Sequence, residues 1–306
     1  MANILLIFVD GLGLGAADPD SNPLVRFDPP FFRALFGRPL TLQAAPFISD
    51  TACLVAIDAA LGVAGLPQSA TGQTALFTGV NAPRAMGRHI LGFPGPALAE
   101  IIAAHGVMKQ LAGQGYSVTS ANMYSPNYLD LVAQRKRRHS VTTLTILGAG
   151  QRLRCLADMA AGQAVYQDIT NEMLPGFGVD SVPQVSPAEA GRRLAGLAAS
   201  HRFTLFEYFQ TDRQGHKRDW GEARRIVGVL DEFFAAVHQA AADNTLVVIT
   251  SDHGNFEDFS TKTHTENPVP LIVWGPDCRR FAQRINDLTD VKAAILDYLK
   301  EGEVLD

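Results

Sequence analysis

Three aspartates stand directly behind apolar segments, in positions where carboxylates can hold a metal ion. Each follows a run rich in β-branched or aromatic residues: Asp10 after Ile4–Val9, Asp212 after Phe203–Thr211, and Asp252 after Leu246–Ser251. Such runs are typical of strands that are buried on both faces of a parallel sheet. Because ligands bind outside the carboxyl ends of parallel strands, we expect the three carboxylates to lie close together.

Three histidines accompany these aspartates and are candidate ligands as well. His216 lies four residues after Asp212, His253 directly follows Asp252, and His264 lies eleven residues after His253. Mixed carboxylate and imidazole sites suit Mn²⁺ or Zn²⁺, whereas Mg²⁺ and Ca²⁺ prefer oxygen ligands alone. The other five histidines are expected to be surface or hydrogen-bonded core residues: His89, His105, His139, His201 and His238.

The segment LPQSATGQTALFTG offers a nucleophile. Pro67 ends the preceding segment, and Ser69 can cap a short helix that is expected to stop at Gly79. A hydroxyl at a helix N-terminus lies among unpaired N–H groups that can hold the oxygens of a phosphate. Ser69 is therefore the candidate nucleophile. Two alternatives are that Ser69 only caps the helix and that Thr71 carries the reactive hydroxyl.

The glycines of FVDGLGLG, residues 8 to 15, allow a different interpretation. Gly11, Gly13 and Ala16 fit the G-x-G-x-x-G/A spacing of dinucleotide-binding loops. Such loops lead directly into a helix whose N-terminus binds the pyrophosphate. Prolines at positions 19, 23, 29 and 30 break any helix here. We therefore expect the glycines to let the chain turn tightly beside Asp10, which argues against a nicotinamide-dependent oxidoreductase.

The elements that position these residues alternate between helix and strand. Ser186, Pro187 and Glu189 have the spacing of a helix start, and that helix is expected to run to about Ala199. Asp219 can cap the next helix, and a last strand at Leu271–Trp274 precedes a helix from about residue 289. This order predicts an α/β fold with a doubly wound, mostly parallel sheet sandwiched by helices.

The middle of the chain has a different character. From about residue 85 to 185 the glycines and prolines multiply and the apolar runs shorten. We predict an inserted α/β cap domain over 85–185 and a catalytic core formed by 1–84 and 186–306, although the part 106–121 could belong to the core sheet. A basic segment, Arg135-Lys136-Arg137-Arg138, is expected on the cap surface, and its arginines could alternatively grip a phosphate of the substrate.

The composition indicates a globular chain that does not bind nucleic acid. The chain has 306 residues, of which 47% are hydrophobic, and a net charge of −5, so no basic field would attract nucleic acid or anionic lipid. Its three scattered cysteines are expected to be free thiols. The first apolar run is too short for a signal peptide, and no run is long enough to span a membrane. A cytoplasmic protein is the working hypothesis; the sequence does not indicate an oligomeric state.

Together these motifs resemble the alkaline phosphatase superfamily, in its branch of cofactor-independent phosphoglycerate mutase and phosphopentomutase. TSDHGNFED followed by HTENPVPLIV resembles the C-terminal metal motif of the mutases, and DRQGHKRD resembles their D-x-x-G-H element. DGLGLG matches the N-terminal metal aspartate, and SATGQ stands where these enzymes carry a Ser or Thr nucleophile. The resemblance covers about 1–80 and 200–276, with four motifs in the family's order.

The resemblance implies two metal ions and a phosphoserine intermediate. It places Asp212, His216 and His264 on one ion, and a second ion on the set Asp10, Asp252, His253 and the Ser69 oxygen. Gln73 departs from the family, because the mutases usually carry a histidine there. The insert of about 100 residues is nearer in size to the phosphopentomutase cap than to the transferase insert of phosphoglycerate mutase.

The leading hypothesis is a two-metal phosphoryl-transfer enzyme that acts on a small phosphorylated metabolite. Water as the final acceptor would make it a phosphatase, and a second substrate hydroxyl would make it a mutase. The alternatives are a phosphodiesterase or other hydrolase of the same superfamily and, less favoured, a non-catalytic metal-binding module.

Overall fold

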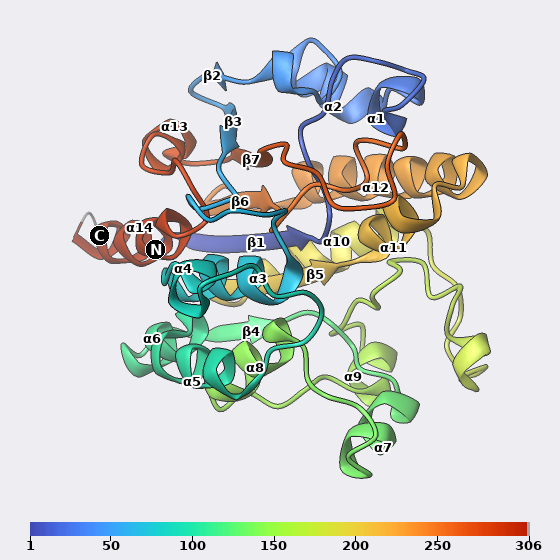
Figure 1. Cartoon of the computed structure of the whole chain (residues 1–306). Helices are drawn as coiled ribbons and strands as arrows, with labels where there is room; N and C mark the ends of the chain where they lie inside the picture. Colours follow the sequence, from blue (N-terminus) through green and yellow to red (C-terminus); the bar gives the residue numbers. More distant parts are fainter. Residues whose placement is uncertain (305–306) are drawn as a thin grey trace.

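The three apolar runs form three adjacent, parallel strands. They are β1 (Asn3–Val9), β5 (Phe203–Tyr208) and β6 (Thr245–Thr250), with β1 between the other two. The computed structural model describes residues 1–304, and its strands form one sheet in the order β2-β3-β7-β6-β1-β5-β4 (Figure 1). Since β6, β1 and β5 run in the same direction, their carboxyl ends meet at one edge of the sheet.

The remaining strands extend the sheet on both sides. β4 (Val118–Ser120) pairs in parallel with β5. On the other side, β7 (Val269–Trp274), β3 (Ala52–Ile57) and β2 (Phe47–Ile48) add antiparallel pairs. The predicted α/β class is confirmed; the sequence analysis did not anticipate β2 and β3.

Helices cover both faces of the sheet (Figure 1). Because neighbouring residues of a strand point to opposite faces, Leu5 and Ile7 pack with one buried cluster and Leu6 and Phe8 with the other. The first cluster includes α10 and α12, and the second includes α3, α6 and α14. The helices of the described chain are α1 (Pro23–Arg26), α2 (Pro30–Phe36), α3 (Ser69–Thr78), α4 (Ala82–Met86), α5 (Pro96–His105), α6 (Val107–Gly113), α7 (Pro126–Ala133), α8 (Val141–Gly148), α9 (Leu156–Ala160), α10 (Pro187–Ala199), α11 (Gln210–Lys217), α12 (Trp220–Ala240), α13 (Cys278–Ala282) and α14 (Asp290–Val304), with short 3₁₀ turns η1 (Leu42–Ala44) and η2 (Pro175–Phe177).

Two predicted helix starts are confirmed at atomic detail. The Ser186 side chain accepts a hydrogen bond from the backbone N–H of Glu189, and Pro187 is the first residue of α10. The Asp219 side chain accepts from the N–H groups of Gly221 and Glu222 and so caps α12. Both caps satisfy donors that the first helical turn leaves unpaired.

The predicted cap region has two parts in the structure. Helices α5, α6 and α8 share a buried cluster with the core strands, and β4 belongs to the same sheet. Residues between 123 and 179 build a smaller cluster of their own, which includes Met123, Tyr166 and Leu174. The division at residues 84 and 185 stays a prediction, and any separate lobe would centre on this second part.

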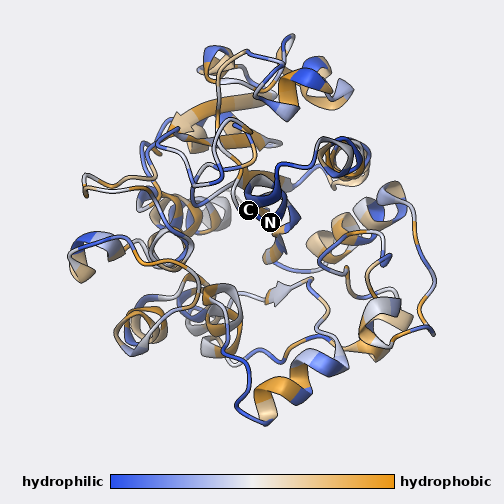
Figure 2. Ribbon diagram, turned by 45° about the vertical axis from the view of Figure 1, so that its right-hand side comes forward, coloured by the Kyte–Doolittle hydropathy of each residue, from blue (hydrophilic) through white to orange (hydrophobic). Residues whose placement is uncertain are grey.

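The hydropathy of the chain follows these layers. Figure 2 shows hydrophobic colouring concentrated on the strands and on parts of the helices, while the loops are largely hydrophilic. Within residues 1–304, none of the helices has the length and apolar character that crossing a membrane requires. The three cysteines are free thiols, as predicted.

Candidate metal centre

The carboxyl ends of β1 and β6 bring a first group of ligand atoms together. Asp10 follows β1, and Asp252 and His253 follow β6. One ligand atom from each of these residues lies within 4.8 Å of the other two. His253 Nε2 is 3.2 Å from Asp10 Oδ1 and 3.6 Å from Asp252 Oδ2. These spacings place three potential ligands around one point.

A second group adjoins the first and shares His253 with it. Ligand atoms of Asp212, His253 and His264 also lie within 4.8 Å of one another. His264 Nε2 is 3.4 Å from Asp212 Oδ1, and the His253 and His264 rings stack with centroids 3.6 Å apart. His216 Nε2 lies 3.5 Å from the same Asp212 oxygen. The six side chains that the sequence analysis selected as metal ligands therefore form one cluster.

Backbone carbonyls orient two of the imidazoles. His264 Nδ1 is 2.8 Å from the Pro67 carbonyl oxygen, and His216 Nδ1 is 2.7 Å from that of Lys262. A hydrogen bond of this kind holds the proton on Nδ1 and leaves Nε2 as the electron-pair donor toward a metal. The Nε2 atoms of His264 and His216 lie 3.4 and 3.5 Å from Asp212 Oδ1, an arrangement that fits ligands of a shared ion.

The electrostatics of the cluster favour cations. Burial, followed by the charges of Asp252, Asp212 and Glu207, raises the pKa of Asp10 well above its ordinary value. Oδ1 of this carboxylate accepts no hydrogen bond from the residues that the structure describes. A buried carboxylate with an oxygen that accepts no hydrogen bond and with like charges around it is stabilised by a bound cation, because the cation removes the repulsion. The residues present thus fit a divalent metal.

The glycines after β1 have a steric role. Gly11 has a φ of 73°, and a Cβ there would lie 2.8 Å from the Cα atom of Asp212. A Cβ on Gly13 would collide with the Glu257 carboxylate, which accepts a hydrogen bond from the Gly13 N–H. The next helix begins only at Pro23. This close approach of two backbones agrees with the expected tight turn beside Asp10.

Ser69 reaches the cluster from helix α3. It is the first residue of α3, and its Oγ lies 3.0 Å from His253 Nε2. The N-cap position belongs to Gln68, whose side chain makes no capping hydrogen bond, so capping is not the role of Ser69. The Thr71 hydroxyl is buried, donates to the Gln68 carbonyl and accepts from the Ile90 N–H. Of the two candidate hydroxyls, the structure brings Ser69 to the cluster.

Two residues at the site were not predicted to act there. Gln73 Nε2 donates to Asp10 Oδ2 at 3.3 Å and to Asp252 Oδ2 at 3.0 Å, so one amide bridges two carboxylates. Glu207 lies within β5 and accepts a 2.8 Å hydrogen bond from Thr142. Burial raises the pKa of Glu207 to about 7. The sequence signal that could have identified Glu207 is a carboxylate inside the otherwise apolar run of β5.

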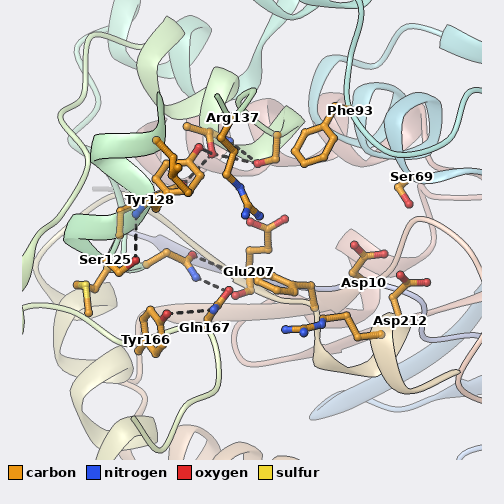
Figure 3. Close-up of a pocket in the computed structure, with 18 of the residues that line it drawn as sticks. Asp10, Ser69, Phe93, Ser125, Tyr128, Arg137, Tyr166, Gln167, Glu207 and Asp212 are labelled. Carbon is orange, nitrogen blue, oxygen red and sulfur yellow. Dashed lines mark hydrogen bonds between the residues drawn. The ribbon is translucent and has the colours of Figure 1, made fainter. Parts of the chain in front are cut away.

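A cavity of about 440 Å³ opens beside the cluster (Figure 3). Asp10, Ser69 and Asp212 contribute to its wall, and Arg137 is the residue of the basic segment that lines it. Arg135 and Arg138 are not among the lining residues, and the Arg138 guanidinium lies over the ring of Phe93. Arg213, which follows Asp212 on α11, lines the cavity as well.

Comparison with known proteins places this site in a family. Two curated relatives are a 2,3-bisphosphoglycerate-independent phosphoglycerate mutase of Desulforudis audaxviator, 30% identical over 127 residues, and a phosphopentomutase of Mycoplasmopsis pulmonis, 28% identical over 109 residues. These matches cover 39% and 34% of this chain and 25% and 28% of the relatives, so the chain matches about a quarter of their length.

The fold is shared with alkaline phosphatase. The solved structure of the enzyme from the Antarctic bacterium TAB5 aligns with a TM-score of 0.52 at 14% identity, over 97% of this chain and 98% of that one. The model of the metalloenzyme superfamily matches residues 2–301, which includes every element of the cluster. The chain therefore belongs to the metalloenzyme superfamily.

Proposed function

We propose that this protein is a two-metal phosphoryl-transfer enzyme, a phosphatase or phosphomutase, that acts on a small phosphorylated metabolite through a phosphoserine. The observation that carries the proposal is the position of Ser69 Oγ, 3.0 Å from His253 Nε2 and at the wall of the cavity. A hydroxyl is thus presented both to a ligand cluster and to the space where a substrate would lie.

The six ligand side chains and Ser69 divide into two sets. Asp212, His216 and His264 would hold one ion, and a second set would hold the other: Asp10, Asp252, His253 and the Ser69 oxygen. The structural grouping, in which His253 also lies near Asp212, supports two adjacent ions. The mixture of carboxylates and imidazoles favours Mn²⁺ or Zn²⁺. When bound, such ions neutralise the charge of a phosphoryl group and lower the pKa of a bound hydroxyl.

The residues of the chain supply the nucleophile and its position. Ser69 Oγ would attack phosphorus in line with the ester oxygen, which leaves as an alcohol after taking up a proton. Water, or a second hydroxyl of the substrate, would then attack phosphorus and return Ser69 to its free form. Gln73 would keep Asp10 and Asp252 in place through its two hydrogen bonds.

The relatives support this reaction class without choosing between its two outcomes. Both names denote mutases, which move a phosphoryl group within a substrate. A phosphodiesterase or other hydrolase of the same superfamily is the second candidate. A non-catalytic module is disfavoured, because all the ligand side chains converge and a hydroxyl is aimed at them.

The test compares one variant of Ser69 with one variant of Thr71. Ser69→Ala is expected to lose turnover of phosphate monoesters by about a thousandfold or more, since the covalent step has no nucleophile. Thr71→Ser should keep turnover within about threefold, because it preserves the hydroxyl and its hydrogen bonds. Free phosphate and isomerised product are measured separately, with Mn²⁺ and with Zn²⁺, over a set of phosphorylated metabolites.

A trapped intermediate gives the decisive result. Mass spectrometry of acid-quenched enzyme should find the phosphoryl group on Ser69. Phosphate on Thr71, or turnover near the wild-type rate in Ser69→Ala, would contradict the proposed nucleophile.

A further inference from the structure

The cavity extends well beyond the ligand cluster. Its volume of about 440 Å³ falls within the ~300–1,000 Å³ range of pockets that enclose most of a ligand. Figure 3 shows Ser69, Asp10 and Asp212 toward one end and Tyr128 and Tyr166 toward the other. A phosphoryl group at Ser69 would therefore leave a large space for the rest of the substrate.

Aromatic rings line that space. The aromatic residues of the wall are Phe93, Tyr124, Tyr128, Tyr166, Phe177 and Phe209. Phe93 is 36% exposed and Phe177 is 38% exposed, although both are large apolar side chains. They come from a loop before α5 and from η2, segments far apart in the sequence. Apolar surface left open at a cavity is typical of a ligand-binding groove.

The polar ends of two tyrosines are engaged within the wall. The Tyr128 hydroxyl lies 3.0 Å from His139 Nδ1, and the Tyr124 hydroxyl lies 3.2 Å from Thr143 Oγ1. Their ring centroids are 5.2 Å apart. Since the hydroxyls already have partners, what these side chains offer a ligand is mainly ring surface.

The lining carries charges of both signs beside this aromatic surface. The lining cations are Arg137 and Arg213, and the Arg138 guanidinium lies over the ring of Phe93. In the remaining space, the Arg137 and Glu207 side chains point toward one another (Figure 3). Because burial raises the pKa of Glu207 to about 7, its carboxyl is largely protonated below neutral pH and does not exclude an anion. The aromatic surface, not charge, therefore distinguishes this part of the cavity.

Resting on the proposed phosphoryl transfer, we propose that the substrate is a phosphate monoester of a ring-bearing alcohol, with Phe93 and Phe177 holding the ring. A small ester without a ring, such as glycerol 3-phosphate, would leave the aromatic wall unfilled. An apolar ring would instead cover the exposed phenylalanines, and aromatic pairs add specific attraction to that burial.

Three alkyl esters separate the effects of ring and charge. Benzyl phosphate, glycerol 3-phosphate and 3-phosphoglycerate all release a primary alcohol, so differences in leaving-group chemistry are small. With the Mn²⁺-loaded full chain, kcat/KM for benzyl phosphate is expected to exceed that for glycerol 3-phosphate by about tenfold or more. A kcat/KM that is equal, or higher for glycerol 3-phosphate, would overturn the proposal, and 3-phosphoglycerate measures the separate effect of a carboxylate.

Variants of the aromatic wall test the assigned residues. Phe93→Ala and Phe177→Ala should each reduce the benzyl-to-glycerol ratio of kcat/KM about fivefold to tenfold. Leu91→Ala is the matched control, because Leu91 lies in the same loop as Phe93 and is 74% exposed but does not line the cavity. Equal ratios in Phe93→Ala and Leu91→Ala would refute the role of Phe93.

A binding measurement gives a readout without turnover. Benzylphosphonate, which has no ester bond to break, should bind the loaded wild-type chain in calorimetry and bind Phe93→Ala about tenfold more weakly. If the enzyme turns over glycerol 3-phosphate with a kcat/KM as high as that for benzyl phosphate, the inference about the ring is wrong and the proposed function stands. Absence of turnover for all three esters, together with absence of phosphonate binding, defeats the proposed function too.

Discussion

At the scale of single residues, the site is a set of neighbouring carboxylates, and hydrogen bonds from neutral donors reduce the repulsion between them. Gln73 donates to both Asp10 and Asp252 and so holds two like charges at a fixed spacing. The amide is a neutral donor, so it bridges the two carboxylates without adding a charge to the site. Residues that orient metal ligands in this way affect metal affinity without touching the ion.

Gln73→Ala is therefore expected to weaken metal binding by about 10- to 100-fold, because Asp10 and Asp252 lose their shared donor. Calorimetric titration of the metal-free protein with Mn²⁺ measures the change. Gln68→Ala is the control, since the Gln68 side chain makes no capping hydrogen bond at the start of the same helix. Unchanged affinity in Gln73→Ala would show that the amide does not organise the ligands.

Glu207 should make the stability of the metal-free protein depend on pH. Burial raises its pKa from 4.5 to about 7, so between these values the folded chain binds a proton that the unfolded chain has released. The free energy of unfolding therefore falls as pH rises from about 4.5 to 7, by at most about 3 kcal/mol from this group. Glu207→Gln is expected to remove this contribution.

Denaturant unfolding of both proteins at pH 5 and pH 8, with metal chelated, measures the effect of Glu207 together with its influence on the pKa of Asp10. Asp10 shifts the stability of both proteins in the same direction, so the informative quantity is the difference between wild type and Glu207→Gln. A difference that does not change between the two pH values would mean that Glu207 keeps an ordinary pKa.

At the scale of elements, the ligands depend on short segments that leave the strand ends. Asp212 lies in the first turn of α11, and α12 begins directly after that helix with Asp219 as its N-cap. The buried face of α12, which includes Phe233 and Phe234, packs against the sheet. This packing fixes where α11, and with it Asp212, can lie.

Asp219→Ala should lower the free energy of unfolding by about 1 kcal/mol, within a range of roughly 0.5–2 kcal/mol for lost N-caps. The physical reason is that the N–H groups of Gly221 and Glu222 lose their acceptor. Urea unfolding followed by circular dichroism measures the change. Asp243→Ala removes an exposed carboxylate in the turn before β6 and should leave stability within about 0.5 kcal/mol. Equal effects of the two substitutions would exclude a capping role.

At the scale of the whole molecule, the cluster joins parts of the chain that are far apart in sequence. Its side chains come from the ends of β1 and β6, from α3 and α11, and from the segment before β7. A ligand that binds only when all these parts are in place stabilises the folded state as a whole.

Removal of metal is thus expected to lower the melting temperature in calorimetry. Each ion at a hundredfold excess over its dissociation constant contributes about 2.7 kcal/mol by mass action. Adding Mn²⁺ or Zn²⁺ back should restore the melting temperature of the wild type. The same addition should raise the melting temperature less in Asp252→Asn and His264→Ala. Identical melting temperatures with and without metal would contradict the assignment of a metal centre.

The sequence by itself determined the sheet core and the chemistry of its edge. Apolar runs of β-branched residues identified β1, β5 and β6 because strands buried on both faces need continuous apolar surface. The aspartates behind them and the histidines at short spacing were recognisable because parallel strands end at one edge. Ser186 and Asp219 were readable as caps, since capping depends on residues only a few positions apart.

Only the tertiary structure decided which side chains share a point in space. His253 lies between Asp10 and Asp212, and Gln73 spans two carboxylates, because distant segments pack together in ways that local spacing does not encode. The same holds for the basic segment, where the fold brings Arg137 to the cavity and leaves Arg138 over Phe93. The cavity wall is assembled from segments that lie far apart in the sequence, so its aromatic character emerges only on folding.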